Sequence, residues 1–409
     1  GYDFAKPVAY REDFNSIFSE LKYQWKINSK LQLTPRFSFK KQTPWKTAAD
    51  SSTEEYNKSA SRMLGNLTLS YNPTRAINIL AGGEYYSDLA KDFVDSSYFS
   101  NDEQEITYSN YSVFFQGLVK VYIGSGDPFN FILGARYDKH NVYGDAFVPR
   151  VGITKRFNKL HFKTLYSNSF RAPAIENINL AVDGIIRPEK TAVIEVELGY
   201  QIGRNSILTI NLFDISTKDP IVYFFDDSTE ADTYSNVLIT SGTRGIEAEF
   251  KTRGKWGYFS FNYSYYTANG KERIDYYSVE ANTSSLLGLA NHKITANVCL
   301  HVNSYLTLNI SGTMLGKRYG YLSIDDKDTT YEQAEFDPVI LANAYVNFEP
   351  KKIPGFSMGV GVYDILQSEY SFIQPYNGGH AVMPGPSREI IFRLGYTFTK
   401  TRKKNPAGL

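Results

Sequence analysis

The stretch Leu31-Gln32-Leu33-Thr34-Pro35-Arg36-Phe37-Ser38-Phe39 alternates between apolar and polar side chains at every position. Successive side chains of a β-strand point to opposite faces, so this alternation predicts a strand with one apolar and one polar face. The same period recurs in residues 192–200, 244–253 and 390–398, and no long amphipathic helical pattern is present. The sequence therefore predicts an all-β protein.

Strand length and connection length indicate which kind of β protein this is. Many of the expected strands run for about 10 to 13 residues, which fits a tilted membrane crossing better than a globular strand. Tight turns are expected at residues 28–29, 72–75, 124–128, 158–159, 203–205, 254–255 and 303–304. Long polar connections are expected at residues 42–60, 87–108, 139–146, 169–189, 218–242, 268–291, 319–337 and 365–387. Outer-membrane barrels have this arrangement, with the short turns on the periplasmic side, so we predict an antiparallel transmembrane β-barrel.

Composition agrees with a barrel and excludes other classes. The chain of 409 residues carries 44 Lys and Arg against 43 Asp and Glu, which argues against a nucleic-acid binder. A single Cys cannot form a disulfide framework. No apolar run is long enough for a membrane-spanning helix, whereas 32 Tyr and 27 Phe fit the aromatic girdles of a membrane barrel.

Several short motifs occur in a fixed order. Residues 166–176 read Tyr-Ser-Asn-Ser-Phe-Arg-Ala-Pro-Ala-Ile-Glu, and Arg187-Pro188-Glu189-Lys190 leads toward Glu197-Leu198-Gly199-Tyr200. In these motifs the chain resembles the TonB-dependent outer-membrane receptors, in which a Phe-Arg-Ala-Pro box, here Phe170, Arg171, Ala172 and Pro173, lies in an outer loop. A Pro-Glu segment, here Pro188 and Glu189, then enters the next strand. Further similar stretches lie at 211–221, 236–247, 361–370 and 384–398.

The resemblance implies a plugged receptor barrel of which this sequence holds only a part. We count about 17 strands of an expected barrel of about 22, because bacterial single-chain barrels close with an even number and plugged transporters have 22. Residues 1–398 are thus expected to be a partial receptor barrel whose front strands and plug are absent from this sequence. We expect residues 399–409, with Arg402, Lys403 and Lys404, to be a basic periplasmic tail.

The resemblance also implies a function and partners. Such a receptor is an integral protein of the outer membrane of a Gram-negative bacterium and imports a scarce nutrient, here a ferric siderophore or a cobalamin-like chelate. The implied partners are the TonB energy-coupling complex, acting through the plug, the small-molecule ligand, membrane lipid and lipopolysaccharide. Neither a nucleic acid nor a cofactor is implied.

Three groups of residues are candidates for a role in uptake. The polar face of the strands is expected to direct charged side chains into the lumen, as contacts for a plug or as solvated ladders: Arg150, Arg156, Glu195, Glu197, Glu247, Glu249, Lys251 and Arg253. The box residues either pack the loop or contact the ligand, and loop packing is the favoured reading. Aromatic residues in or beside the outer loops either capture a partly apolar chelate or form a girdle: Tyr98, Tyr223, Phe224, Phe225, Tyr319 and Tyr321.

Other functions find less support in the sequence. No nucleophile motif, paired-carboxylate motif or metal-ligand spacing is present, so the prediction is a protein that is not an enzyme and has neither catalytic residues nor a metal site. A passive porin-like diffusion channel of the outer membrane is the alternative, since it shares the alternation but lacks the motif order. A soluble β-sandwich or propeller would need shorter strands or regular repeats.

Overall fold

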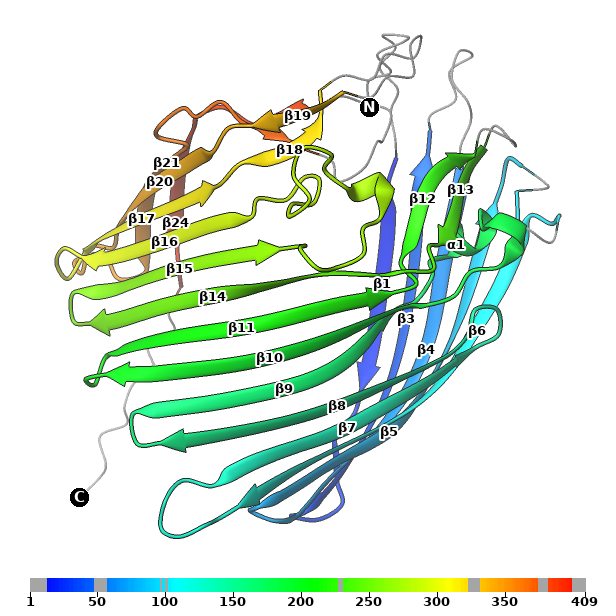
Figure 1. Ribbon diagram of the computed structural model, residues 1–409. Helices are drawn as coiled ribbons and strands as arrows, with labels where there is room; N and C mark the ends of the chain where they lie inside the picture. Colours follow the sequence, from blue (N-terminus) through cyan, green and yellow to red (C-terminus); the bar gives the residue numbers. More distant parts are fainter. Residues whose placement is uncertain are drawn as a thin grey trace. The chain divides into compact units, whose positions relative to one another are not determined.

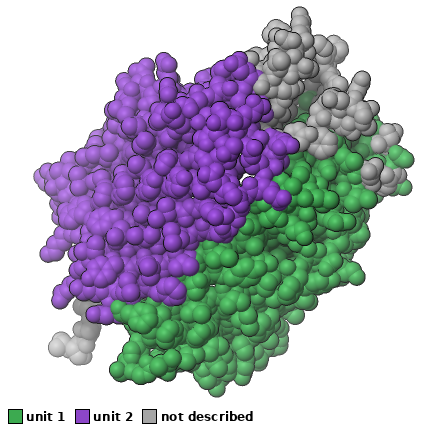
Figure 2. Space-filling view, viewed as in Figure 1, with its two compact units in different colours: residues 1–157, 163–195, 215–242 green, residues 158–162, 196–214, 243–409 purple. Residues whose placement is uncertain are grey.

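The computed structural model describes residues 13–47, 57–95, 98–99, 102–226, 231–322, 332–373 and 382–398. The predicted basic tail at residues 399–409 lies outside this part of the chain. Contacts group the chain into two compact units, coloured separately in Figure 2. Unit 1 comprises residues 1–157, 163–195 and 215–242, and unit 2 comprises residues 158–162, 196–214 and 243–409.

Long antiparallel strands dominate unit 1 (Figure 1). In chain order they are β1 (Asn15–Lys22), β2 (Trp25–Lys26), β3 (Leu31–Lys46), β4 (Asn57–Thr74), β5 (Ile77–Asp92), β6 (Glu105–Val121), β7 (Phe129–His140) and β8 (Gly144–Phe157). β1 and β2 both pair with β3, and each later strand pairs with the strand before it. A short hairpin of β12 (Ile221–Asp226) and β13 (Ala231–Asn236) also belongs to this unit.

Four strands have residues in both units: β9 (Leu160–Arg171), β10 (Glu189–Ile202), β11 (Ser206–Lys218) and β14 (Thr240–Gly254). The other strands of unit 2 are β15 (Gly257–Thr267), β16 (His292–His301), β17 (Leu306–Leu315), β20 (Val339–Phe348), β21 (Phe356–Tyr363) and β24 (Glu389–Tyr396). They pair antiparallel in this order from β14 to β24. Two small hairpins complete the unit: β18 (Arg318–Tyr321) with β19 (Gln333–Phe336), and β22 (Ser371–Phe372) with β23 (Met383–Pro384).

The predicted fold class is confirmed. Among the described residues, eighteen strands belong to the main sheet. Because β1 and β2 pair with successive parts of β3, they count as one strand position, and the total of 17 agrees with the expected number. Helical structure in the described residues is limited to α1 (Ile175–Asn179) and the 3₁₀ turns η1 (Val182–Gly184) and η2 (Asp275–Tyr277). None of the helices in the described residues has the length and apolar character that a membrane span requires.

Connections between strands alternate in length, with one correction. At the predicted turn Asn28-Ser29, the Asn28 side-chain oxygen accepts hydrogen bonds from the backbone N–H of Lys30 and Leu31, at 2.8 and 3.0 Å. This Asx-type turn reverses the chain with few residues. The predicted long connection at 139–146 is wrong: β7 and β8 extend into it and leave only a turn at residues 141–143. The strand conformation extends to His140 in β7 and begins again at Gly144 in β8, although these residues are polar or small and their sequence predicts a loop.

The alternation gives the sheet of unit 1 two distinct faces. On the apolar face, large side chains from β3 to β7 are exposed: Phe37, Leu67, Leu69, Tyr85, Tyr111, Val113, Phe115, Leu133 and Tyr137. The polar face carries Arg36, Arg62, Asn66, Glu84, Asp88, Asn110, Ser112, Arg136 and Asp138. Buried apolar clusters form instead where loops pack together, one in each unit. An exposed apolar face of this extent is the pattern expected of a membrane strand rather than of a soluble sheet.

Candidate functional site

The Phe-Arg-Ala-Pro box ends β9 and begins the connection to β10. Arg171 forms an ion pair with Glu189, with 3.0 Å between its terminal nitrogen and the carboxylate, and also donates a hydrogen bond to the Ile221 carbonyl at 2.9 Å. Glu189 accepts in turn from the Ile221 backbone N–H at 3.1 Å. The box and the Pro-Glu segment therefore meet in space, and together they hold the start of β12. Pro173 and Pro188 are both buried beside this contact.

An apolar cluster packs the connection after the box. Its buried members come from β6, the β7–β8 turn, α1, the segment before β10 and β12: Tyr108, Tyr143, Ile178, Ile186 and Ile221. Hydrogen bonds add to this packing, because the Thr233 hydroxyl and the Tyr234 backbone N–H of β13 each donate to the Leu180 carbonyl at 2.8 Å. Asn236 binds both backbone groups of Arg187, at 2.7 and 3.0 Å. The connection is thus an ordered, packed segment.

Between this segment and the polar face of unit 1 lies a pocket of about 400 Å³. Its lining includes the polar residues Lys40, Gln42, Ser61, Arg62 and Asp88, the rings of Tyr86, Tyr108, His140 and Tyr143, and the loop residues Ala172, Pro173, Ala174, Ile175 and Ile178. We call this the box pocket. Aromatic rings and cations together are suited to holding a partly apolar anion.

One cation of the box pocket is fixed in place. Arg62 forms two hydrogen bonds with Asp88, at 2.6 and 2.7 Å, and its guanidinium lies 3.9 Å from the centroid of the Tyr86 ring. Lys40 is the cross-strand neighbour of Arg62 and is exposed. The pocket therefore places two cations side by side, only one of which is paired with Asp88. The described residues that line it thus carry a net positive charge.

The aromatic wall of the box pocket is stacked. His140 lies parallel to Tyr143, with ring centroids 3.8 Å apart, and its Nδ1 accepts a hydrogen bond from the Val142 backbone N–H. The Tyr143 and Tyr86 hydroxyls are 3.4 Å apart. Burial raises the pKa of Tyr143, which lies in the turn between β7 and β8, so its hydroxyl stays protonated near neutral pH.

A second charged group lies on the polar face next to the box pocket. Arg136 forms hydrogen bonds with both carboxylate oxygens of Asp138, at 2.7 and 2.8 Å, and pairs with Glu84 at 3.0 Å. Asn110 donates to Asp138 at 3.1 Å, and Arg36 pairs with Glu84 at 3.6 Å. Asp138 is 2% exposed, so its charge depends on these partners. We call this group the polar-face network.

The predicted lumenal charges fall on polar strand positions, mostly in local pairs. Glu195 pairs with Lys163 at 3.4 Å, Glu197 with His161 at 3.0 Å, and Glu249 with Lys251 at 2.7 Å. Arg156 pairs with Asp127 at 2.8 Å, Asn211 donates to Glu247 at 3.5 Å, and the side chains of Arg150 and Arg253 are exposed. None of these eight lines the box pocket.

Comparison with known proteins identifies the family. The family described as "TonB dependent receptor-like, beta-barrel" matches residues 2–365. The chain belongs to this family. A comparison with curated protein sequences finds no match.

Solved receptor structures have the same fold. The FrpB iron transporter from Neisseria meningitidis is similar with a TM-score of 0.72 at 15% identity, covering 94% of this chain and 63% of that chain. The siderophore receptor PirA from Acinetobacter baumannii is similar with a TM-score of 0.71 at 14% identity, covering 94% and 62%. A ferric enterobactin receptor mutant from Pseudomonas aeruginosa, solved with enterobactin, gives 0.67 at 13% identity, covering 95% and 71%. The chain thus spans about 62% of the length of PirA.

Within this receptor barrel, the four predicted tyrosines lie outside the box pocket. The Tyr98 ring lies beneath Lys58, 3.0 Å from its ammonium, and the Tyr223 ring packs against Tyr234 with centroids 5.4 Å apart. Tyr319 is buried and donates to Glu335 at 2.9 Å, while Tyr321 packs against the loop cluster of unit 2. Phe224 and Phe225 belong to β12, but their side chains lie outside the described part of the chain.

Of the residues that line the box pocket, Ala172 and Pro173 belong to the predicted Phe-Arg-Ala-Pro box. The sequence does not single out the strand residues of the pocket or those of the polar-face network. Arg62, Asp88, Arg136 and Asp138 occupy alternate positions in their strands, so the alternation places them on the polar face, but it does not give the register between strands. The described residues contain no group of three or more His, Cys, Asp or Glu side chains placed to hold a metal ion.

Proposed function

We propose that this chain is the barrel part of a TonB-dependent receptor in the outer membrane of a Gram-negative bacterium. In this proposal the receptor imports a scarce iron chelate, a ferric siderophore or a similar anionic chelate, with a cobalamin-like chelate as a further ligand class. The TonB energy-coupling complex acts through a plug domain, and the chain carries out no catalytic step.

The observation that carries the proposal is the contact between the family motifs. Arg171 of the box and Glu189 of the Pro-Glu segment, at the two ends of the connection between β9 and β10, form one ion pair and hold a packed loop beside the box pocket. The match to the receptor family over residues 2–365 supports the same reading. Similar structures described as a siderophore receptor and an iron transporter support iron as the cargo.

The chemistry of the box pocket supports an anionic, partly apolar ligand. Lys40 and Arg62 present two neighbouring cations, and stacked rings form the adjacent wall. Rigid aromatic rings offer contact area with little loss of side-chain entropy, and charge complementarity increases the rate of capture. A ferric chelate that carries negative charge around an organic shell would satisfy both features.

The proposed receptor function is tested by asking whether iron uptake requires TonB and cellular energy. The full-length receptor would be expressed in a Gram-negative host that lacks its own siderophore receptors, and uptake of radioactive iron bound to a catecholate siderophore would be followed. We expect uptake that stops when TonB is deleted or a protonophore is added. Uptake that continues without TonB would instead support the passive porin-like channel.

A pair of neighbouring lysines tests the box pocket. Lys40→Ala removes an exposed cation from the pocket, whereas Lys41→Ala removes the next cation along β3, which points to the opposite face. We expect Lys40→Ala to weaken binding of the ferric siderophore by about fivefold to tenfold, a loss near 1 kcal/mol, and Lys41→Ala to leave it unchanged. Binding would be measured by fluorescence titration of the purified receptor. Equal effects of the two changes would rule out the pocket as the binding site.

A further inference from the structure

A groove lies on the apolar face of unit 1, where two glycines are neighbours. Gly65 of β4 is paired with Tyr85, and Gly83 of β5 is paired with Leu67, so the glycines are diagonal neighbours on adjacent strands. A Cβ atom at Gly65 would meet nothing within 4 Å, and one at Gly83 would meet only the Ser112 carbonyl at 3.6 Å. The floor is therefore open because two side chains are missing. The groove has a volume of about 840 Å³.

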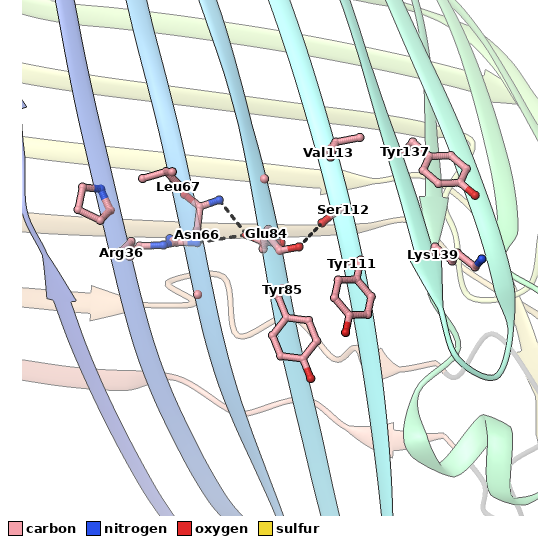
Figure 3. Close-up of a pocket in the computed structure, with 13 residues that line it drawn as sticks. Arg36, Asn66, Leu67, Glu84, Tyr85, Tyr111, Ser112, Val113, Tyr137 and Lys139 are labelled. Atoms are coloured by element: carbon pink, nitrogen blue, oxygen red, sulfur yellow. Dashed lines mark hydrogen bonds and ion pairs between the residues drawn. The ribbon is translucent and has the colours of Figure 1, made fainter.

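Apolar and amphipathic side chains form the walls of this groove. Pro35, Leu67 and Val113 line it, together with the rings of Tyr85, Tyr111 and Tyr137. Figure 3 shows Tyr85 beside Tyr111, with ring centroids 4.7 Å apart, and Tyr137 on the neighbouring strand β7. Tyr rings with an apolar body and a polar hydroxyl are the residues that membrane proteins place at the level of the lipid head groups.

A cation completes the rim of the groove. Lys139 lies in one row with Tyr111 and Tyr85 across β7, β6 and β5 (Figure 3). Its cross-strand neighbour on β8 is Asp145, yet among the described residues no carboxylate lies within ion-pair distance of the Lys139 ammonium. The charged residues Arg36 and Glu84 point to the polar face, where they pair with each other at 3.6 Å. Lys139 is thus the charge that faces the groove.

We propose that this groove binds one acyl chain of a membrane lipid whose anionic phosphate head group contacts Lys139. The inference rests on the membrane location in the proposed function and concerns the opposite face of the sheet from the box pocket. The missing side chains at Gly65 and Gly83 make room for the chain, and the tyrosine hydroxyls and Lys139 complement the head group. Of the thirteen lining residues, Arg36, Asn66, Glu84 and Ser112 belong to the polar face, so nine positions of the apolar face form the groove. A stable protein interface needs about 20 to 30 residues per partner, so a lipid fits the groove better than a second protein copy.

Lipid retention by the full-length receptor tests the proposal. The receptor in detergent would be mixed with phosphatidylglycerol or with zwitterionic phosphatidylcholine, and retained lipid would be counted by native mass spectrometry. We expect phosphatidylglycerol to be retained preferentially. Lys139→Gln should lower its retention by about fivefold and leave retention of phosphatidylcholine unchanged.

Two glycine variants separate filling of the groove from a general effect of a larger side chain. Gly65→Leu fills the floor and should abolish retention of both lipids. Gly312→Leu is the matched control, because Gly312 of β17 also has nothing within 4 Å of its Cβ position and lies on the same strand face as the exposed Ile310. It should retain lipid like the unchanged receptor. Folding of each variant would be checked by its heat-dependent shift in gel mobility.

Three results would overturn the inference: equal retention of the two lipids by the unchanged receptor, equal effects of Gly65→Leu and Gly312→Leu, or a receptor dimer in place of a lipid adduct. A measurement of iron uptake shows whether the lipid inference or the proposed receptor function is wrong. Loss of lipid retention in a variant that still imports iron in a TonB-dependent way supports both proposals. Absence of iron uptake by the unchanged receptor counts against the receptor function alone.

Discussion

Buried charge is the main residue-scale feature of the polar face. Asp138 is almost fully enclosed and accepts hydrogen bonds from Arg136 and Asn110, which is 1% exposed. A buried carboxylate is tolerable only with such partners, and removing one member of a buried pair leaves the other uncompensated. The polar-face network therefore has a structural role that the exposed lumenal charges do not share.

We expect Asp138→Ala to lower the free energy of unfolding by about 2 to 3 kcal/mol, a value reduced from that of a fully buried pair because Arg136 is one-third exposed. Arg150→Ala, on the same face but exposed, should change it by less than about 0.5 kcal/mol. Urea unfolding of the receptor in lipid vesicles, followed by Trp fluorescence, measures both. Equal effects would show that the network adds no stability.

Gly199 illustrates a glycine required by a close approach. A Cβ atom there would overlap the ring of His161, which is held by Glu197 on the same strand as the glycine. We expect Gly199→Ala to displace the ring and to destabilise the sheet by about 1 to 3 kcal/mol, as overpacking does. Gly312→Ala, where the space is open, is the control. Thermal unfolding monitored by circular dichroism compares the two, and a similar midpoint for both would contradict the close approach.

At the scale of elements, the connection after the box depends on packing rather than on local helix propensity. α1 has five residues, far too few to be stable alone, and its Ile178 is 5% exposed within the apolar cluster. The neighbouring Ile185 is 66% exposed. The sequence motif thus fixes where the loop begins and ends, while tertiary packing fixes its shape.

Ile178→Ala should release this loop without unfolding the strands. Removal of a buried Ile side chain costs about 2 to 4 kcal/mol of packing free energy. A helix as short as α1 has too few other contacts to stay packed after this loss. We expect faster proteolytic cleavage within residues 172–188 at unchanged heat-dependent gel mobility. Ile185→Ala should leave the cleavage rate unaltered. Global unfolding of the Ile178 variant, or equal cleavage of both variants, would argue against a separately packed loop.

At the scale of the whole molecule, the two faces of the strands have opposite chemistry. Leu133 of β7 is 59% exposed on the apolar face, and the next residue back, Ile132, lies on the polar face. In the proposed membrane setting one face contacts lipid and the other contacts water or a plug. The cost of a charge should therefore differ between adjacent positions of one strand.

We expect Leu133→Arg to lower the free energy of unfolding in lipid vesicles by about 2 to 4 kcal/mol, because an Arg near the bilayer midplane is costly. Ile132→Arg should cost less than half as much. Urea titration in vesicles gives both values. A larger loss of unfolding free energy for Ile132→Arg than for Leu133→Arg would show that the polar face contacts lipid, and it would contradict the lipid proposal.

The sequence by itself determined the fold class, the approximate number of strands in the main sheet and the family. Strand periodicity is local, so Leu31 to Phe39 shows its two faces without any knowledge of its neighbours. The box and Pro-Glu motifs identified the family for a similar reason, since their order is read along the chain. The alternation gave strand ends less well, because strands such as β7 and β8 continue through polar residues that the sequence assigns to a connection.

Only the tertiary structure decided which residues meet. The register between strands brings Arg62 to Asp88 and Arg136 to Glu84, and folding of the loop brings Arg171 to Glu189. The groove at Gly65 and Gly83 likewise exists only because two strands place their glycines side by side. Register and loop packing arise from contacts between residues distant in sequence, and a local pattern carries no information about which distant residue will be the partner.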